Sequence, residues 1–204
     1  AEVWAYGFGN LDKALNLFEE GLSLADDPGM LDGRRFWHEL NARDFSAALN
    51  TAENYKSVSR SYYLSIVHYL TGGPNASASL LDTALINTIE RPLVGHDREA
   101  FRQGRIGLIK AMQGDKQGAI EAGKRALAIT PASENALNGP DHIYRLAEIY
   151  GLVGEPDLAF DLLEDLLGYP NRTSIWRIKL NPFFDSLRDH PRYLKLIDEK
   201  RSSA

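Results

Sequence analysis

Three arginines recur at one position of a pattern that repeats along the chain. Arg34, Arg105 and Arg145 each stand nine residues before a predicted turn, and in each case they fall on the first helix of a predicted helix pair. A guanidinium group offers a planar fork of N–H donors that matches a carboxylate. The spacing therefore predicts a groove in which these arginines hold an acidic segment, or the C-terminal carboxylate of a peptide, in an extended form.

Further residues complete this candidate groove, either one helical turn beyond the arginine position or next to it as flat apolar surface. They are Trp37, Tyr63, Val67, Leu108, Tyr144 and Glu148. An alternative is that the arginines pair with local acids such as Glu39 or Glu148, as charged helical residues commonly do. Two other binding alternatives stay open: an anionic metabolite in the same groove, and self-association through Trp4 and Phe8.

One segment imitates a phosphate-binding loop. The stretch Gly118–Arg125 reads GAIEAGKR, but Arg125 stands where such a loop needs Ser or Thr to hold magnesium. The stretch also falls inside a predicted amphipathic helix, whose backbone amides are consumed by internal hydrogen bonds. We therefore expect no nucleotide site there.

The remaining polar residues form no recognisable catalytic or metal-binding set. The 5 histidines are scattered, none of them paired at the four-residue spacing of a helical metal site, and there is no cysteine. No serine lies in the context of a nucleophile elbow. We expect no catalytic residues, no cofactor and no metal, with an enzyme built in the groove as a distant alternative.

The elements that must position the groove are helix pairs. Five turn-like residues are each followed, five positions later, by a small residue that opens a helical apolar stripe. The turn positions are Gly9, Arg43, Gly73, Gly114 and Gly154, and the small residues are Ala14, Ala48, Ala78, Ala119 and Ala159. Small residues at these positions allow two antiparallel helices to approach closely, so the sequence predicts an all-α repeat array.

The pattern resembles that of the tetratricopeptide repeat family. The residues that carry the resemblance are Leu146, Ala147, Tyr150, Gly154 and Ala159 in the last pair, and Ala119, Ala126 and Pro131 in the pair before it. The resemblance implies a right-handed superhelical stack of antiparallel helix pairs, an α-solenoid, in which the first helix of each pair lines a concave groove. It implies a protein-binding function, and the arginines resemble in part the carboxylate clamp of some of these domains.

We expect about five repeats over residues 1–168, the first incomplete, and capping helices over residues 169–204. Asn181-Pro182 and His190-Pro191 each look like the start of a helix, because Pro is favoured at the first helical position. The tail is similar to the end of the tetratricopeptide regions of bacterial multidomain regulatory proteins. That similarity implies a scaffold or sensory module in signalling. Since Trp4 to Phe8 reads as the end of a helix, we expect the chain to be a fragment of something longer.

Composition limits the partners. The formal net charge of the 204 residues is -5, and without a basic run the chain is not expected to bind nucleic acid. No apolar run approaches the roughly 18 residues of a spanning helix, so we expect no direct membrane insertion. We expect a partner protein or peptide, with a homo-oligomer as an option, in the cytoplasm. A soluble extracytoplasmic part of a membrane-anchored protein is the alternative location.

Overall fold

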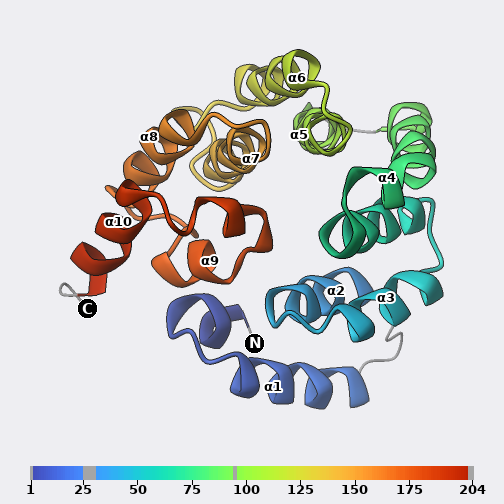
Figure 1. Ribbon diagram of the computed structural model, residues 1–204. Helices are drawn as coiled ribbons and strands as arrows, with labels where there is room; N and C mark the ends of the chain where they lie inside the picture. The colour runs from blue at the N-terminus through green and yellow to red at the C-terminus, as the bar shows by residue number, and fades with distance from the viewer. Residues whose placement is uncertain (1, 25–30, 94–95, 202–204) are drawn as a thin grey trace. The chain divides into compact units, whose positions relative to one another are not determined.

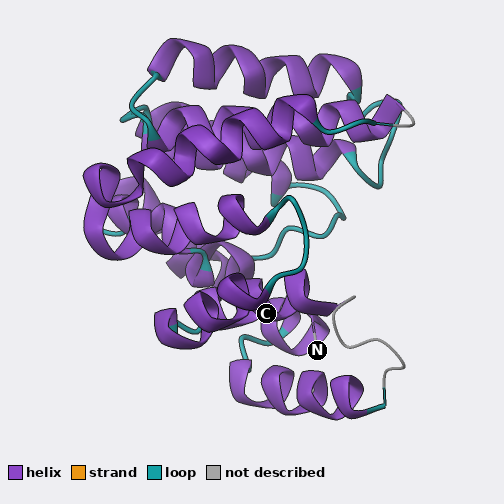
Figure 2. Cartoon of the chain, turned by 90° about the vertical axis from the view of Figure 1, so that its right-hand side faces the viewer, coloured by secondary structure: helices purple, strands orange, loops and turns teal. Residues whose placement is uncertain are grey.

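The computed structural model describes residues 2–24, 31–93 and 96–201, and within these ranges the chain is helical with no strand (Figure 2). The expectation of an all-α fold is confirmed. In chain order the helices are η1 (Val3–Gly7), α1 (Leu11–Ser23), α2 (Asp32–Asn41), α3 (Phe45–Asn54), α4 (Arg60–Glu90), α5 (His96–Met112), α6 (Lys116–Ile129), α7 (Gly139–Leu152), α8 (Pro156–Leu166), α9 (Ile175–Leu180), η3 (Pro182–Leu187) and α10 (Pro191–Arg201) (Figure 1).

The helices pack as two compact units. Unit 1 contains the chain up to Asn87 together with Trp176–Pro182. Unit 2 contains Thr88–Ile175 and the chain from Phe183 onward. A stretch near the end of the chain therefore belongs to the first unit, which the sequence did not indicate.

Each of the five predicted turns has a left-handed backbone. The described residues with positive φ are Gly9 (67°), Arg43 (62°), Gly73 (76°), Gly114 (81°) and Gly154 (75°). Glycine adopts this conformation without steric cost, and it is the usual way for a helix to end. At the turns around Arg43 and Gly114, the next amide bonds back into the helix: Asp44 N–H to the Glu39 carbonyl at 3.0 Å, and Asp115 N–H to the Lys110 carbonyl at 2.9 Å. The turn positions were thus predicted correctly from the sequence.

The residue after the turn starts the second helix of the pair. The side chains of Asn10, Asp44 and Asp115 each accept a hydrogen bond from the backbone N–H three residues later, at 3.0, 2.9 and 2.9 Å. Such N-caps satisfy an amide that the helix itself leaves without a partner. One turn residue and one cap together therefore reverse the chain within two positions.

Four of the five predicted small residues are completely buried. Ala14, Ala48, Ala119 and Ala159 have 0% exposure. Ala78 is exposed instead, and Ser77 takes the buried position. The reason lies in Pro74, which follows the turn at Gly73 directly and is itself helical, so that α4 continues without a capping residue. The second helix starts one residue sooner there, and its buried face moves back by one residue.

Glycines bring three helices of unit 2 close together. A Cβ added to Gly107 on α5 would lie 2.9 Å from the carbonyl oxygen of Ala119 and 3.2 Å from the amide nitrogen of Gly123, both on α6. It would also lie 2.6 Å from Cδ1 of Ile149 on α7. Hydrogen is the only substituent that fits at this crossing, which fixes the distance between the α5 and α6 backbones.

The two predicted capping helices begin where expected, since η3 starts at Pro182 and α10 at Pro191. Phe183, Phe184 and Leu187 of η3 are buried, and the Phe184 ring meets Tyr144 of α7 edge-on at 5.7 Å between ring centres. Within unit 2, η3 therefore packs on the last helix pair, whereas Leu194 of α10 is exposed.

Helix α9 was not predicted, and most of it belongs to unit 1. Ring atoms of Trp176 lie 2.5 Å from the place that a Cβ on Gly9 would occupy. The guanidinium group of Arg43 donates to the backbone carbonyls of Leu180 and Asn41. Trp176 lies in the segment 169–204 that the sequence assigns to the cap, but its ring packs against the first turn of unit 1.

Candidate functional site

The nine residues of the candidate groove divide between the two units, and each set is described within its own unit. In unit 1, Arg34 is exposed on α2 and forms an ion pair with Glu2 at 3.7 Å. Trp37 is half-buried. Tyr63 and Val67 on α4 are buried, and the ring of Tyr63 lies 4.6 Å from that of Phe36. The aromatic residues predicted as groove surface thus contribute largely to the core between α2 and α4.

In unit 2, three of the five predicted groove residues are also buried. Leu108, Tyr144 and Glu148 are almost inaccessible, whereas Arg105 and Arg145 are half-buried. Arg145 contacts the Glu148 carboxylate at 2.6 Å, one turn further along α7. Leu108, Tyr144 and Glu148 are too deeply buried to form part of a surface that a peptide would contact.

Two of the three recurring arginines therefore have acidic partners inside their own units. Arg145 pairs with a nearly buried carboxylate, and Arg34 pairs with an exposed one. This is the local pairing that the sequence left open as an alternative, although Glu39 pairs with Arg35, at 2.8 Å, rather than with Arg34. The grouping of the nine residues into one continuous groove stays a prediction.

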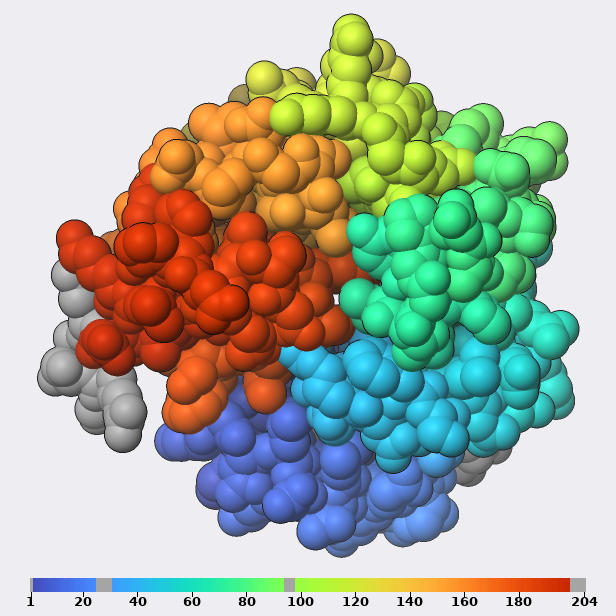
Figure 3. Space-filling view, in the orientation of Figure 1, coloured from blue at the N-terminus to red at the C-terminus, as the bar shows by residue number. Residues whose placement is uncertain are grey.

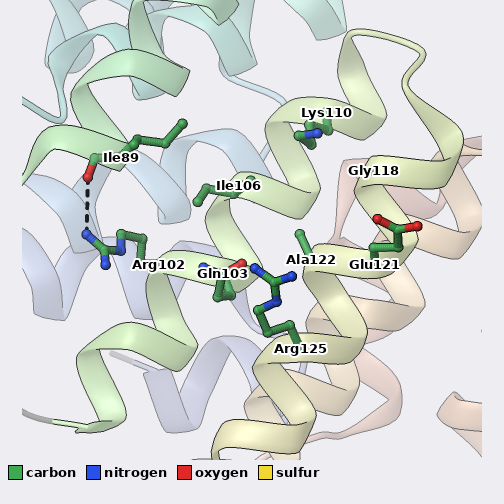
Figure 4. Close-up of a pocket in the computed structure, with 9 residues that line it drawn as sticks. All are labelled: Ile89, Arg102, Gln103, Ile106, Lys110, Gly118, Glu121, Ala122 and Arg125. Carbon is green, nitrogen blue, oxygen red and sulfur yellow. Dashed lines mark hydrogen bonds between the residues drawn. The ribbon is translucent and has the colours of Figure 1, made fainter.

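A cleft of about 320 Å³ lies in unit 2, between the end of α4 and the helices α5 and α6 (Figure 4). It combines cations with apolar side chains. It is lined by Ile89, Arg102, Gln103, Ile106, Lys110, Gly118, Glu121, Ala122 and Arg125. In the space-filling view, α6 forms part of the outer surface of its unit, so one wall of the cleft faces solvent (Figure 3).

Two of the cations in the cleft are already neutralised. Arg102 forms an ion pair with Glu99 and donates to the carbonyl oxygens of Ile89 at 3.1 Å and Arg91 at 3.4 Å. It therefore fastens the end of α4 to α5. Lys110 contacts the Asp115 carboxylate at 2.9 Å. Both side chains hold the cleft together and are less available to a ligand.

Arg125 differs from them. It is exposed on α6, and it forms no hydrogen bond or ion pair with any residue in the described ranges. Its charge is nevertheless felt across the cleft at Glu99. Burial by itself would raise the pKa of Glu99, but hydrogen bonds from Gln103 and Arg102 and the charges of Arg102 and Arg125 bring that pKa below its ordinary value.

The carboxylate of Asp115 at the edge of the cleft is also held ionised. The hydrogen bond from Lys110, followed by the backbone N–H of Gly118, lowers the pKa of Asp115. Both acids therefore stay charged near neutral pH, and both offset a cation. Of the three cations in the cleft, Arg125 is the one that forms no ion pair with a described acid, and Glu121 contributes one negative charge to the same lining.

The apolar part of the cleft comes from three residues. Ile89 is 53% exposed at the rim, and Ile106 and Ala122, at 9% and 7%, lie deeper. A cation beside a small apolar surface suits a carboxylate that is attached to an apolar group. None of the side chains that line the cleft is placed as a nucleophile with an activating base.

This cleft was not predicted from the sequence, although the spacing of some of its lining residues places them on shared helical faces. Arg102, Ile106 and Lys110 are spaced by four on α5, so they share one helical face. Gly118, Ala122 and Arg125 similarly share a face of α6. In the sequence, Arg125 is notable only because it stands where a phosphate-binding loop needs Ser or Thr. The segment 118–125 lies inside α6, as expected.

Two buried polar side chains of unit 1, His38 and Glu39, belong to its core. His38 lies between the rings of Tyr6, at 6.2 Å, and Phe18, at 5.3 Å, and burial lowers its pKa. The neighbouring Glu39 is held by Arg35 across one helical turn. Neither side chain opens into the cleft, which belongs to the other unit.

Over the described residues the molecule is thus all-helical, and unit 2 contains a cleft lined by both cations and apolar side chains. Comparison with protein-family models, with curated proteins and with solved structures found no match to this chain. Within the described ranges, no three His, Asp or Glu side chains are grouped to hold a metal ion. None of the helices in those ranges has the length and apolar character needed to cross a lipid bilayer.

Proposed function

We propose that this chain is a helical-repeat module that binds a partner protein or peptide, of the tetratricopeptide type, in a larger bacterial regulatory protein. The observation that supports this proposal is the row of five left-handed turns. Each turn separates two helical segments, and four of them precede a fully buried small residue at the same spacing. Such regularity favours stacking of equivalent pairs into a right-handed superhelix with an extended surface, whose use is recognition rather than catalysis.

The ionisable residues support binding more than chemistry. Buried acids such as Glu39 and Glu148 are engaged by arginines on their own helices, which is a structural arrangement. Catalytic groups need a free acid, base or nucleophile that faces a substrate. The cleft beside Arg125 instead offers a cation that forms no ion pair with a described acid, next to apolar side chains, which suits an acidic protein segment. The cytoplasm is the compartment that we propose.

This function is tested by selecting a phage-displayed library of random peptides on the immobilised chain. We expect the enriched peptides to converge on a shared motif, and soluble copies of them to bind at micromolar concentration or better. A matched selection on the thermally unfolded chain controls for non-specific apolar capture. A selection without convergence, or one that enriches the same peptides on the unfolded chain, would refute a peptide-binding function.

Self-association is a second candidate, because two apolar residues of unit 1 are exposed. Val3 and Phe8 are 69% and 62% exposed, while Trp4 is partly covered by Phe8 and by the Lys13 amine 3.6 Å from its ring centre. Exposed apolar side chains are a common feature of interfaces between copies. Sedimentation velocity at increasing concentration, with Phe8→Ser as the comparison, separates this candidate from peptide binding.

A further inference from the structure

We propose that the cleft between α5, α6 and the end of α4 is the anchoring site of this module, where Arg125 pairs with an Asp or Glu side chain of the partner. An apolar residue next to that acid in the partner would lie on Ile89 and Ile106. The inference rests on the proposed function and names both the place and the chemistry of recognition. It differs from the groove predicted from Arg34, Arg105 and Arg145.

Two of the three cations that line the cleft are balanced by acids of the protein. Arg102 and Lys110 each contact an acid of the protein, Glu99 and Asp115 respectively. Glu121, the one acid of the lining itself, accepts a hydrogen bond from Gln117 at 2.9 Å. Figure 4 shows Glu121 directed away from Arg125. Glu121 keeps its negative charge, so the attraction that an incoming carboxylate meets is local to Arg125, the cation of the lining without an ion pair to a described acid.

The position of Arg125 leaves its guanidinium group accessible to an incoming carboxylate. In Figure 4 its side chain extends from α6 toward Gln103 of α5, across the open part of the cleft. The Gln103 amide donates to Glu99 at 2.7 Å, and Arg102 binds the other oxygen of the same carboxylate. Since Glu99 is occupied on both oxygens, its negative charge is largely offset where a second carboxylate would approach Arg125.

The size and shape of the cleft favour a protein segment over a free small molecule. Its volume of about 320 Å³ is at the lower end for a ligand pocket and has room for one or two side chains. Ile89 and Arg125 at its rim are exposed, so the cleft would leave a free small molecule largely in contact with water. A partner segment that continues over the surface of α5 and α6 gains contacts that a small molecule lacks. The occupant is therefore an acidic and apolar segment of another protein.

The test uses the complete chain and two charge-reversed variants that differ by one position. Arg125→Glu reverses the charge in the cleft, and Lys124→Glu makes the same reversal on the neighbouring exposed residue of α6, which does not line the cleft. Arg125→Gln removes the charge without placing a second acid near Glu99. Thermal unfolding of each variant verifies that the fold is kept, as expected for exposed residues.

Peptides enriched from the random library are expected to contain Asp or Glu next to an apolar residue. Their dissociation constants, measured by fluorescence polarisation, should rise about tenfold or more for Arg125→Glu, and several-fold for Arg125→Gln, because a charge-assisted pair is lost. They should change less than about twofold for Lys124→Glu. In ¹H–¹⁵N spectra of the unmodified chain, one such peptide should shift resonances of α5, α6 and the end of α4.

Five outcomes overturn the inference. Equal weakening by Arg125→Glu and Lys124→Glu would leave only a long-range charge effect, and enriched peptides without acids would remove the proposed recognition chemistry. Millimolar sodium acetate can serve as a simple competing carboxylate. If it shifts the same resonances and displaces the peptide equally well from the unmodified chain and from Arg125→Gln, Arg125 is not the anchor. If peptides bind but their shifts fall elsewhere, the proposed function stands and this site fails; if no peptide converges, both fail.

Discussion

Substitution of Gly107 by Ala is the most direct test of how unit 2 is held together. A Cβ at this position of α5 would lie 2.9 Å from the carbonyl oxygen of Ala119, 3.2 Å from the amide nitrogen of Gly123 and 2.6 Å from Cδ1 of Ile149. Two of these neighbours are backbone atoms of α6. A change of side-chain rotamer therefore cannot relieve the contact, and the two helices must move apart.

Two opposing effects set the magnitude. Alanine is a better helix former than glycine by about 1 kcal/mol, which favours the variant. Overpacking of a close helix crossing costs about 1–3 kcal/mol, and a clash with backbone places Gly107 at the upper end of that range. We expect a net loss of about 1–2 kcal/mol in the free energy of unfolding, which corresponds to a decrease of roughly 2–8 °C in Tm for a chain of this size.

Two matched glycines make the reasoning testable by urea and thermal unfolding followed by circular dichroism. Gly21 on α1 has no atom within 4 Å of the added Cβ, so Gly21→Ala should stabilise by about 0.5–1 kcal/mol. At Gly123 the near atoms are Cδ1 of Leu146 at 2.7 Å and of Ile149 at 3.0 Å, the mobile ends of side chains, so the net change should be near zero. If Gly107→Ala is as stable as Gly21→Ala, the close approach of α5 and α6 is refuted.

Three further predictions concern the turns, the buried small residues and pH. Ala119→Leu should destabilise by about 1–3 kcal/mol because the site is fully buried, whereas Ala78→Leu at an exposed site should be close to neutral in the same urea titrations. Gly114→Ala should cost about 1–2 kcal/mol from its positive φ alone, since no atom lies within 4 Å of the added Cβ, and calorimetry showing no loss would contradict the left-handed turn. Burial lowers the pKa of His38, so the unfolded state binds a proton first as pH falls below about 6.5; stability should therefore be present above that pH and decrease below it. His38→Gln should flatten this dependence between pH 7 and pH 5, and an unchanged slope would assign it to other groups.

The turns were predictable because a left-handed residue and a buried small residue both leave a mark in the sequence. The spacing of five positions holds wherever an additional residue caps the second helix, as Asp44 and Asp115 do. It fails by one position after Gly73, where Pro74 removes the separate cap. The sequence contains that proline, but the effect of a missing cap on the register of a helix face becomes visible only in three dimensions.

The candidate site was less predictable, because similar charges on similar helices have different surroundings. Arg145 and Arg125 both lie on amphipathic helices, yet Arg145 pairs with Glu148 on its own helix, whereas Arg125 forms no ion pair with a described residue. The spacing of three residues between Arg145 and Glu148 is visible in the sequence and indicates an ion pair between them on one helix. The cleft itself depends on how closely Gly107 lets α5 approach α6, which no spacing within one helix reports.

The discontinuity of unit 1 has a consequence for synthesis of the protein. The turn at Arg43 is tied to the carbonyl of Leu180, 137 residues further along the chain. During translation, helices α1 to α4 leave the ribosome long before α9 exists, so Gly9 stays uncovered by Trp176 until α9 has been made. Contacts between such distant segments form late and slowly. Helices α5 to α8 of unit 2 follow one another without interruption and can pack as they emerge, although the core of unit 2 also waits for Phe183 and Phe184 of η3, which follow α9.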